Sequence, residues 1–460
     1  MSHINPAMFK MYDVRGIVST DLTPDVVRQI GQAFGSESLA QNSKTVCIGR
    51  DGRLHSEMLS QALAEGLQAA GCDVIDVGMV PTPVLYFATH HLNTGTGIMV
   101  TGSHNPPEYN GLKMSMATKT LYGDDITALY TRIVENNLST QGGGHYRQED
   151  LLETYMDRIV SDVKLERPLN IAVDCGNGVA GVCATELFTR LGCKVTELYC
   201  DVDGTFPNHH PDPSKMENLV DVRNAVSQNN LDLGLAFDGD GDRVGVIDNK
   251  ENIIWPDRQM ILYSEDVLSR NPGAQIIYDV KSSYLLDAAI KEMGGEALMW
   301  KTGHSLIKAK MKETGALLAG EMSGHIFFKE RWFGFDDGLY SAARMLEILS
   351  KKSPTAEEIF SAIPNSCNTP EINIHFEEGQ HHVFMDNFKN KSQFEDATDI
   401  STIDGMRISW ADGWGLIRPS NTTPCLVLRF EAETDNALEN IQAKFRSQLL
   451  ATDASLKLSF

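Results

Sequence analysis

Short apolar runs alternate with amphipathic segments along most of the chain. Three stretches share one order of elements: an apolar run of strand length, a polar loop, a segment of helical periodicity, a glycine and a second apolar run. They are "TVCIGRDGRLHSEMLSQALAEGLQAAGCDVIDVG", "NIAVDCGNGVAGVCATELFTRLGCKVTELY" and "QIIYDVKSSYLLDAAIKEMGGEALMW". A glycine just past a helix suits a left-handed C-cap, and short strands alternating with helices are typical of parallel α/β units. The pattern predicts three related α/β domains.

The pattern changes near Asn368. The segments "INIHF", "MRISW", "WGLIRPS" and "CLVLRFEAET" alternate or run apolar at strand length, and "NALENIQAKFRSQLL" has the periodicity of one amphipathic helix. This part of the chain predicts a small α+β domain with an antiparallel sheet. The predicted fold is therefore three similar mixed α/β domains followed by a smaller α+β C-terminal domain around a central cleft. The expected boundaries are 1–150, 151–255, 256–367 and 368–460.

The composition is that expected of several globular domains, and its net charge limits the partners that the protein can have. A chain of 460 residues is too long for one hydrophobic core. The 40 basic and 62 acidic residues give a formal net charge of −22, which opposes general attraction to nucleic acid or anionic lipid. Any anion that the protein binds must therefore meet basic residues gathered locally.

Cysteine usage and hydropathy bear on the compartment. The eight cysteines include no C-x-x-C pair, so we expect buried thiols in a reducing compartment rather than zinc ligands or disulfides. The N-terminal "MSHINPAMFKMYDVRG" lacks the apolar core of a signal peptide, and no apolar run approaches the ~18 residues that span a bilayer. The expected location is the cytoplasm.

The first candidate loop is "TGSHNPPEYNGLK", residues 101–113, because ligands of open α/β folds gather where strands end. Here Ser103 and His104 precede two prolines. A serine hydroxyl is a weak nucleophile that needs a base, a metal or a special setting. Proline and Asn-Gly also make ordinary turns, so the segment alone fits a turn and an active site equally well. It lacks the G-x-S-x-G signature of an α/β-hydrolase.

The second loop, "DGDGDR", places Asp238, Asp240 and Asp242 between two apolar strands. Along a straight strand neighbouring carboxylates on one face would lie ~6.6 Å apart, too far for all three to reach one ion. The intervening glycines let the chain curl, so that the oxygens can converge on a hard cation such as Mg²⁺. The alternative is a solvated acidic hairpin. An EF-hand is excluded because Arg243 stands where its glycine belongs, and Arg243 suits a phosphate ligand instead.

Two neighbouring segments offer ligands for a sugar. The segment "GEMSGH" contains Glu321, Ser323 and His325. Their alternating polar side chains can hydrogen-bond hydroxyl groups, although a strand edge with an ordinary histidine is the alternative that the segment alone favours. The upstream segment "WKTGHSLIK" offers Thr302, Gly303 and His304. Its alternative is a plain helix entry with a serine cap.

The last loop, "LIRPSNTTPCLVLRF", suits a phosphate. Arg418 is followed by Ser420, Asn421, Thr422 and Thr423, held between two prolines. A guanidinium fork with hydroxyl and backbone N–H donors makes a good cradle for a phosphate dianion, and an ordinary Ser/Thr-rich turn is the alternative. Arg429 on the next strand can project to the same side. The N-terminal "FKMYDVRG" adds Tyr12 and Arg15.

Taken together, these loops resemble the α-D-phosphohexomutase family over nearly the whole chain. "TGSHNPPEYNGLK" is similar to its phosphoserine loop, "DGDGDR" to its metal loop, "GEMSGH" to its sugar-recognition loop and "RPSNTTP" to its phosphate-binding loop. The four loops follow the family's order, one per domain. The form "GEMSGH" is most similar to the bacterial phosphomannomutase/phosphoglucomutase branch, whereas glucosamine-specific members carry another residue at the position of Met322.

The resemblance implies an isomerase that interconverts hexose 1-phosphate and hexose 6-phosphate, with mannose phosphate expected first and glucose phosphate also possible. Ser103 would carry a phosphoryl group and complete the coordination of Mg²⁺, with hexose 1,6-bisphosphate as intermediate and activator. The implied metal ligands beside Ser103 are Asp238, Asp240 and Asp242. The implied catalytic residues are Ser103, His104, Arg15, Lys113, Arg243, His304 and His325. The implied substrate ligands are Tyr12, Lys281, Thr302, Gly303, Glu321, Ser323, Arg418, Ser420, Asn421, Thr422, Thr423 and Arg429.

The resemblance also implies a product used for GDP-mannose synthesis and a C-terminal domain that closes over the site. We place the hinge at "PNSCNT", residues 364–369. Three alternatives remain open: a phosphoglucosamine mutase, a non-catalytic sugar-phosphate sensor, and a metal-dependent phosphatase, whose D-x-D-x-T form "DGDGDR" lacks. Sugar phosphates are the expected partners, whereas nucleic acid and membranes are not, and the oligomeric state is not predicted.

Overall fold

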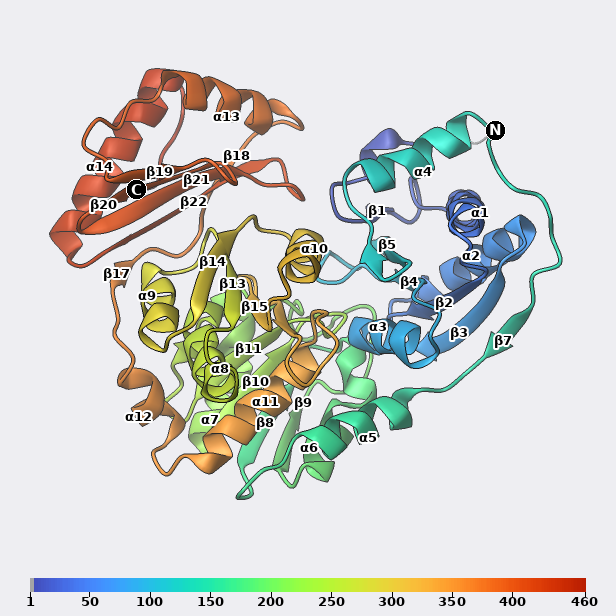
Figure 1. Cartoon of the computed structure of the whole chain (residues 1–460), viewed down its shortest axis with the longest axis horizontal. Coiled ribbons are helices and arrows are strands. Elements are labelled where there is room, and N and C mark those ends of the chain that lie inside the picture. Colours follow the sequence, from blue (N-terminus) through green and yellow to red (C-terminus); the bar gives the residue numbers. More distant parts are fainter. Residues whose placement is uncertain (1–3) are drawn as a thin grey trace.

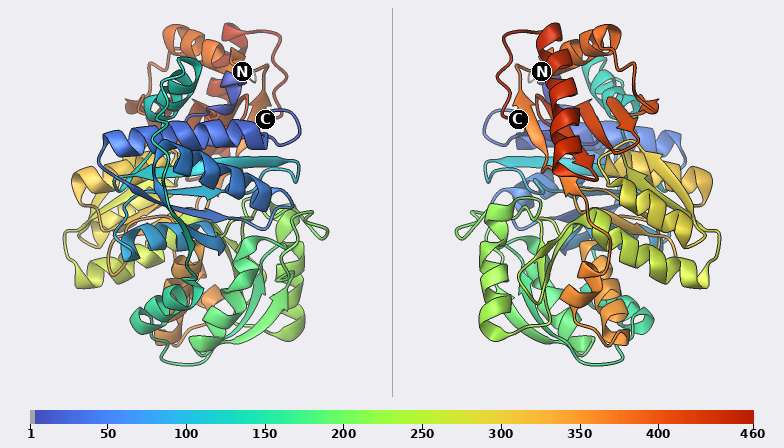
Figure 2. Two further views of the ribbon diagram at one scale, coloured as in Figure 1. Left: turned by 90° about the vertical axis from the view of Figure 1, so that its right-hand side faces the viewer. Right: turned by 90° about the vertical axis from the view of Figure 1, so that its left-hand side faces the viewer.

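The computed structural model describes residues 4–460 and contains four sheets, one in each part of the chain where a domain was expected. Figure 1 shows the first domain on the right, the second below, the third at centre left and the C-terminal domain at upper left. In Figure 2 the second and C-terminal domains lie at opposite ends of the molecule. Among the described residues, no helix has both the length and the apolar character needed to cross a membrane. The predicted fold class is confirmed.

The first domain has a mixed sheet in the order β1-β5-β4-β2-β3-β7, with β6 paired to β5. Its strands are β1 (Val14–Ile17), β2 (Thr45–Arg50), β3 (Asp73–Met79), β4 (Gly97–Val100), β5 (Tyr109–Met116), β6 (Lys119–Thr120) and β7 (Tyr146–Gln148). Its helices are η1 (Pro6–Met8), α1 (Pro24–Ala40), α2 (Ser56–Ala70), α3 (Thr82–His91) and α4 (Asp124–Val134). Helices α1 and α2 pack closely because Gly66 has no side chain, and a Cβ there would lie 2.1 Å from the carbonyl oxygen of Arg28.

The second and third domains have sheets in the orders β12-β11-β10-β8-β9 and β14-β13-β15-β16. The second contains α5 (Leu152–Asp162), β8 (Asn170–Asp174), η2 (Val179–Val182), α6 (Ala184–Arg190), β9 (Lys194–Leu198), η3 (Met216–Leu219), α7 (Val220–Asn229), β10 (Leu233–Phe237), β11 (Val244–Asp248) and β12 (Ile253–Ile254). The third contains α8 (Pro256–Arg270), β13 (Gln275–Asp279), α9 (Tyr284–Glu292), β14 (Glu296–Trp300), α10 (His304–Thr314), β15 (Leu318–Gly320), β16 (Ile326–Phe328), α11 (Gly338–Lys351) and α12 (Ala356–Ser361).

One plan is repeated in these three domains. The three similar stretches of sequence form the parallel pairs β2–β3, β8–β9 and β13–β14, as predicted. The glycines after their helices, Gly71, Gly192 and Gly294, are left-handed with φ of 111°, 98° and 78°. Each domain then adds an antiparallel hairpin, β4–β5, β10–β11 or β15–β16. The first three candidate loops lie between the strands of these hairpins, at equivalent positions.

The C-terminal domain has an antiparallel sheet in the order β17-β22-β21-β20-β19, with β18 also paired to β22. Its elements are β17 (Cys367–Asn368), β18 (Ile372–His375), α13 (Gln380–Lys391), β19 (Asp399–Ser401), β20 (Met406–Trp410), β21 (Gly413–Pro419), β22 (Cys425–Ala432) and α14 (Asp435–Thr452). The four longer strands and α14 match the prediction. Helix α13 was missed because its sequence, "QHHVFMDNFKNK", mixes polar residues into the buried face, including the buried His381. The helix nevertheless contributes Phe384 and Phe388 to the domain core.

The segment expected to act as a hinge, 364–369, is partly built into the C-terminal sheet. Within it, Cys367–Asn368 form β17 and pair with β22. At its start, Arg258 of α8 donates hydrogen bonds to the carbonyl oxygens of Ile363 and Pro364, each at 2.9 Å. The free connection between the third and fourth domains is therefore shorter than predicted.

A buried carboxylate joins the C-terminal domain to the third domain. Glu431 in β22 is 1% exposed and accepts hydrogen bonds from the Trp414 indole at 2.6 Å and from the Tyr284 backbone N–H at 3.2 Å. It also accepts from the hydroxyls of Ser283 and Ser366. Two of these donors open α9 in the third domain, so one side chain fixes β22 of the C-terminal sheet against that helix.

A buried cation adds to the same interface. Arg407 in β20 donates to the carbonyl oxygens of Val280 at 2.6 Å and Ser282 at 2.9 Å, and its guanidinium lies 3.7 Å from the Trp414 ring centroid. Burial lowers the pKa of Arg407 to about 10. The loop after β13 is thus held by hydrogen bonds from the neighbouring domain.

Replacement of Glu431 by alanine should weaken this interface. Because the change leaves buried donors unpaired, we expect Glu431→Ala to lower the free energy of unfolding by about 2–4 kcal/mol. Chemical denaturation followed by tryptophan fluorescence measures the change. The matched control is Glu433→Ala, an exposed carboxylate two residues later, which should change stability by less than about 0.5 kcal/mol. Equal losses in the two variants would contradict the assigned role.

Candidate active site

Ser103 stands in the β4–β5 loop in an unusual backbone conformation. Its φ is +48°, a left-handed value that non-glycine residues adopt only when the surroundings enforce it. The side chain is buried, and its hydroxyl lies 3.1 Å from Asp238 Oδ2 and 3.1 Å from His104 Nδ1. A serine on a strained turn, aimed at a carboxylate of the next domain, is better explained as a reactive group than as an ordinary turn residue.

Two residues that the sequence analysis did not single out for the site hold this loop in place. Asp51 accepts hydrogen bonds from the Thr101 hydroxyl at 2.9 Å and the Gly102 N–H at 3.0 Å. Arg53 donates to four backbone carbonyls of the loop, including those of Ser103 at 2.9 Å and Asn105 at 2.6 Å, and is 4% exposed. Both follow β2 in "RDGR", at the same edge of the sheet as Ser103, and that shared position was the available signal.

The three aspartates of the second loop converge as predicted. Ligand oxygens of Asp238, Asp240 and Asp242 lie within 4.8 Å of one another, and all three residues are fully buried. Lys113 from β5 places its Nζ 2.7 Å from Asp240 Oδ2 and 2.5 Å from Asp242 Oδ2. Burial raises the pKa of Asp238, and raises that of Asp242 to about 6. Burial opposes ionisation of Asp240 as well, but Lys113 outweighs it and lowers that pKa.

This cluster fits a divalent cation. One oxygen each of Asp240 and Asp242, both Oδ1, is buried without a hydrogen-bond partner, so acceptor capacity remains after Lys113 is counted. Carboxylate oxygens are the ligands that Mg²⁺ prefers. A solvated acidic hairpin is excluded, because the carboxylates are buried.

Arg243 links this cluster to its surroundings. Its Nε lies 3.1 Å from Asp238 Oδ2 and its Nη1 lies 3.2 Å from Asp212 Oδ1. Its Nη2 is buried with no hydrogen-bond partner. A free guanidinium N–H beside Ser103's carboxylate neighbour is suited to an anionic oxygen.

Arg15 supports the serine loop from the other side. It donates to the carbonyl oxygen of Gly102 at 2.6 Å and to the Asn105 side chain, and it pairs with Asp13. Asn105 is therefore held both by Arg15 and, through its carbonyl, by Arg53. This places a fixed positive charge next to the strained turn.

The third domain contributes two stacked histidines. The rings of His304 and His325 lie 5.5 Å apart, and both Nδ1 atoms approach Asp336 Oδ2, at 3.5 and 3.1 Å. Burial lowers the pKa of each histidine to about 4. Lys308 neutralises Asp336 at 2.8 Å. Asp336 was not predicted, because it lies in a loop with no motif of its own.

Glu321 lies behind these histidines as a buried acid. Its Oε1 accepts a hydrogen bond from the Gly303 N–H at 2.5 Å, and burial raises its pKa to about 8. Gly303 has φ of +136°, and a Cβ there would lie 2.5 Å from the Tyr12 ring. Ser323, by contrast, contacts Arg243 only through its carbonyl oxygen, at 3.4 Å, which leaves its hydroxyl free.

Tyr12 is the point where three domains meet. Its hydroxyl donates to the Thr302 carbonyl oxygen at 2.8 Å and accepts a hydrogen bond from the Asn421 side chain. Thr302 in turn donates its N–H to Asp404 of the C-terminal domain at 3.0 Å. Asp404, another missed residue, also pairs with Arg418 at 3.0 Å. The β21–β22 loop, which contains Asn421, is thereby connected to the first and third domains.

The remaining predicted residues form a second basic group. Ser420 Oγ accepts the N–H groups of Thr422 and Thr423 at 3.4 and 3.3 Å, which gives the β21–β22 turn its shape. Lys281 pairs with Glu371 at 2.6 Å. The guanidinium of Arg429 is bound to Asp257 at 3.3 Å and to the Lys281 carbonyl oxygen.

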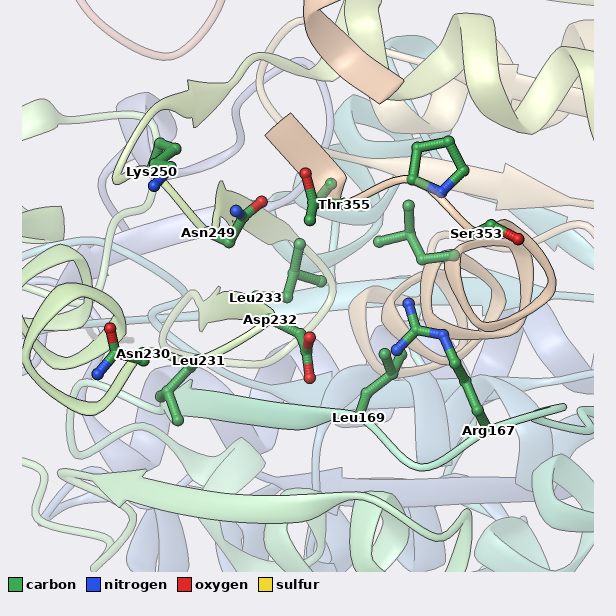
Figure 3. A pocket seen from close by; sticks show the side chains of 13 residues that line it. Arg167, Leu169, Asn230, Leu231, Asp232, Leu233, Asn249, Lys250, Ser353 and Thr355 are labelled. Atoms are coloured by element: carbon green, nitrogen blue, oxygen red, sulfur yellow. The ribbon is translucent and has the colours of Figure 1, made fainter. Parts of the chain in front are cut away.

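The predicted site residues therefore fall into two groups in the structure. Ser103, Lys113, the aspartates, Arg243 and His325 form one connected network. The C-terminal loop is hydrogen-bonded to Tyr12, whose ring lies 6.1 Å from that of His304, the residue stacked on His325. A cavity of about 390 Å³ lies elsewhere, at the start of β10, the strand end opposite to Asp238. Figure 3 shows this cavity, with Arg167, Asp232 and Lys250 on its wall. None of the predicted site residues lines it.

Known proteins are similar to this chain in both sequence and structure. Four family profiles match, described as phosphoglucomutase/phosphomannomutase α/β/α domains I, II and III and the C-terminal domain, at residues 6–140, 153–251, 255–367 and 371–448. The phosphomannomutase/phosphoglucomutase of Pseudomonas aeruginosa is 55% identical over 99% of this chain and 98% of its own. The phosphoglucomutase of Neisseria gonorrhoeae is 52% identical over 97% of each chain. A crystal structure of a phosphoglucomutase/phosphomannomutase family protein from Burkholderia thailandensis has a TM-score of 0.94 and 51% identity over 100% of both chains.

Loss of Arg53 should release the serine loop. Because Arg53→Met removes four hydrogen bonds to carbonyls and leaves Asp51 without its buried cation, we expect a loss of about 3 kcal/mol in stability. Amide hydrogen exchange should accelerate in peptides covering residues 101–109. The matched control is Arg28→Met on α1, an exposed arginine paired with Asp25 and Glu65, which should leave that exchange unchanged. Unaltered exchange in Arg53→Met would refute the role.

The buried Glu321 should make stability fall as pH rises. Its pKa is about 8 in the fold against 4.5 in the unfolded chain, so the folded state binds the extra proton between these values. The contribution of Glu321 is therefore fully favourable below about pH 4.5 and is lost as pH rises through about 8. Glu321→Gln, which keeps the acceptor for Gly303, should gain stability relative to the wild type as pH is raised from 5 to 8. Melting curves of both proteins at each pH measure this, and parallel pH profiles would contradict it.

Proposed function

The chain belongs to the phosphoglucomutase/phosphomannomutase family, and we propose on this basis that it interconverts hexose 1-phosphate and hexose 6-phosphate through a phosphorylated Ser103. The observation that carries the proposal is the convergence of three domains on one cluster of aspartates: Ser103 of the first domain is hydrogen-bonded to Asp238 of the second, and His325 of the third lies 3.6 Å from Asp242. The enzyme is then an isomerase that works by phosphoryl transfer.

The names of the relatives support mannose and glucose phosphates as substrates. The Pseudomonas relative is named for both sugars and the Neisseria relative for glucose. This favours a hexose phosphate over glucosamine phosphate. A non-catalytic sensor is disfavoured, because the serine, the carboxylates and the free Arg243 N–H are all retained.

In the proposed mechanism the chain positions a phosphoryl group and neutralises its charge. A Mg²⁺ ion bound by Asp238, Asp240 and Asp242 would supply charge stabilisation to the transferring group. Arg243 would bind a phosphoserine oxygen with its unpartnered Nη2, while Asp51 and Arg53 hold the serine loop rigid. A fixed loop keeps the phosphoryl group in line with the attacking sugar hydroxyl, which is where most of the rate gain in phosphoryl transfer arises.

The sugar must then present both of its ends to the same serine. We assign the phosphate that does not react to the C-terminal loop, with Arg418, Ser420, Asn421, Thr422 and Thr423 as its ligands and Arg429 and Lys281 in support. Glu321 and Ser323 would bind the 3- and 4-hydroxyls, which look alike from both directions, beside Tyr12, Thr302 and Gly303. Lys113, Arg15, His104, His304 and His325 would supply the charge and the proton acceptors around the reacting hydroxyl.

The intermediate, a hexose 1,6-bisphosphate, would turn over within the site and also serve as activator by rephosphorylating Ser103. We propose the cytoplasm as the place of action, in keeping with eight free thiols. Mannose 1-phosphate formed there is suited to nucleotide activation, as in GDP-mannose synthesis.

The proposal is tested by ³¹P NMR of mannose 1-phosphate with enzyme, Mg²⁺ and a trace of glucose 1,6-bisphosphate, repeated with glucose 1-phosphate. We expect conversion to the 6-phosphates without inorganic phosphate. Accumulation of phosphate would instead identify a phosphatase. Ser103→Ala should lower turnover by at least about 10³-fold and still bind the sugar phosphates, because only the transferring group is removed. Wild-type turnover in Ser103→Ala would overturn the mechanism.

A further inference from the structure

Two cysteines lie side by side where β8 and β9 end, and β8 also pairs with β10, the strand that precedes the aspartate cluster. Strands β8 and β9 run parallel with Asp174 opposite Leu198, so the loops that follow them leave the sheet as neighbours. Cys175 and Cys200 stand in these two loops, and their sulfur atoms are 3.5 Å apart in hydrogen-bond contact. Cys175 is buried and Cys200 is partly exposed. Across residues 4–460, no other two thiols are hydrogen-bonded to each other.

We propose that Cys175 and Cys200 are a redox modification site that forms a reversible disulfide with hydrogen peroxide. The partly exposed Cys200 thiol loses its proton, and the thiolate attacks a peroxide oxygen. The O–O bond breaks, a sulfenic acid forms, and the leaving hydroxide takes up the proton released by Cys200 to give water. The Cys175 sulfur then attacks the Cys200 sulfur, the S–S bond forms, and the sulfenic hydroxyl leaves with the Cys175 proton as a second water. The two thiols are oxidised by two electrons and the peroxide is reduced to two waters.

The surroundings favour this pair over the other cysteines. The hydrogen bond with Cys175 lowers the pKa of the Cys200 thiol, whereas burial raises the pKa of Cys193 to about 12 and that of Cys47 to about 11. The thiolate is the reactive form, so Cys200 should react first and Cys175 should resolve it. A disulfide is ~2.05 Å long, so the sulfur atoms need to approach by only about 1.5 Å.

The site lies at the base of a segment that covers the serine loop. From Cys200 the chain runs to Phe206, whose ring centroid lies 5.1 Å from the Arg53 guanidinium, and to His210, whose ring is hydrogen-bonded to the His104 carbonyl oxygen. Between Cys200 and Phe206, Gly204 packs so closely that a Cβ would lie 2.5 Å from the Arg53 Cα. Oxidation would pull one end of a segment that has little room to move. On the proposed mutase function, we expect slower turnover as the consequence.

The cross-link is tested without any assay of activity. The reduced wild-type protein is exposed to a small excess of hydrogen peroxide, and free thiols are counted after denaturation. We expect a fall from eight to six, a mass loss of about 2 Da and a cross-linked peptide pair containing Cys175 and Cys200, all reversed by dithiothreitol. Cys200→Ser should lose no thiols. The matched control is Cys193→Ser, a buried and unpaired thiol, which should still lose two.

Other outcomes overturn the proposal. A Cys200 sulfinic acid without the cross-link would show that Cys175 does not resolve it, and a loss of two thiols in Cys200→Ser would place the disulfide elsewhere. Turnover of oxidised and reduced wild type is compared separately, with an expected loss of about 10-fold on oxidation. A cross-link without any loss of turnover would overturn the coupling to the serine loop. Inactivity of the reduced protein would instead count against the mutase function and leave the cross-link result intact.

Discussion

The ammonium group of Lys113, held between Asp240 and Asp242, is the interaction on which the site depends. Three buried carboxylates on one short turn would each be strongly desolvated, and isolated buried charges are among the least stable arrangements in a protein. The compensating charges come from different places: Lys113 from the first domain and Arg243 from the loop itself. Docking of the first domain therefore supplies part of the charge that this turn of the second domain needs to stay ionised. Charge compensation and assembly of the site are the same event.

The C-terminal domain is joined to the rest by a different kind of contact. Its links to the third domain are extensive, through Glu431 and Arg407, and bind the loop that carries Lys281. Its links to the first domain are few, chiefly the Asn421–Tyr12 hydrogen bond and the Lys10–Glu378 ion pair at 3.6 Å. The domain is thus anchored on one side and lightly attached on the other, an arrangement that lets one face move more readily than the other.

The sequence predicted those parts of the molecule whose signal is local. The parallel units, the C-cap glycines and the candidate loops could each be identified from a short stretch, because strand periodicity and turn chemistry act over a few residues. Arg53, Asp336 and Asp404 were not identified, because their roles depend on partners more than ten residues away or in another domain. Helix α13 was missed because its buried face includes a histidine. Local sequence patterns do not indicate which polar residues are buried together.

The three hairpins have one further consequence. The loops that contain Ser103, the aspartate cluster and Glu321 each lie outside the ladder of hydrogen bonds, between strands whose register is fixed by their neighbours in the sheet. A change in the length or composition of one loop leaves the pairing of its strands as it was. The fold therefore separates the scaffold from the chemistry: the sequence of one loop can vary while the framework repeated in the three domains stays constant.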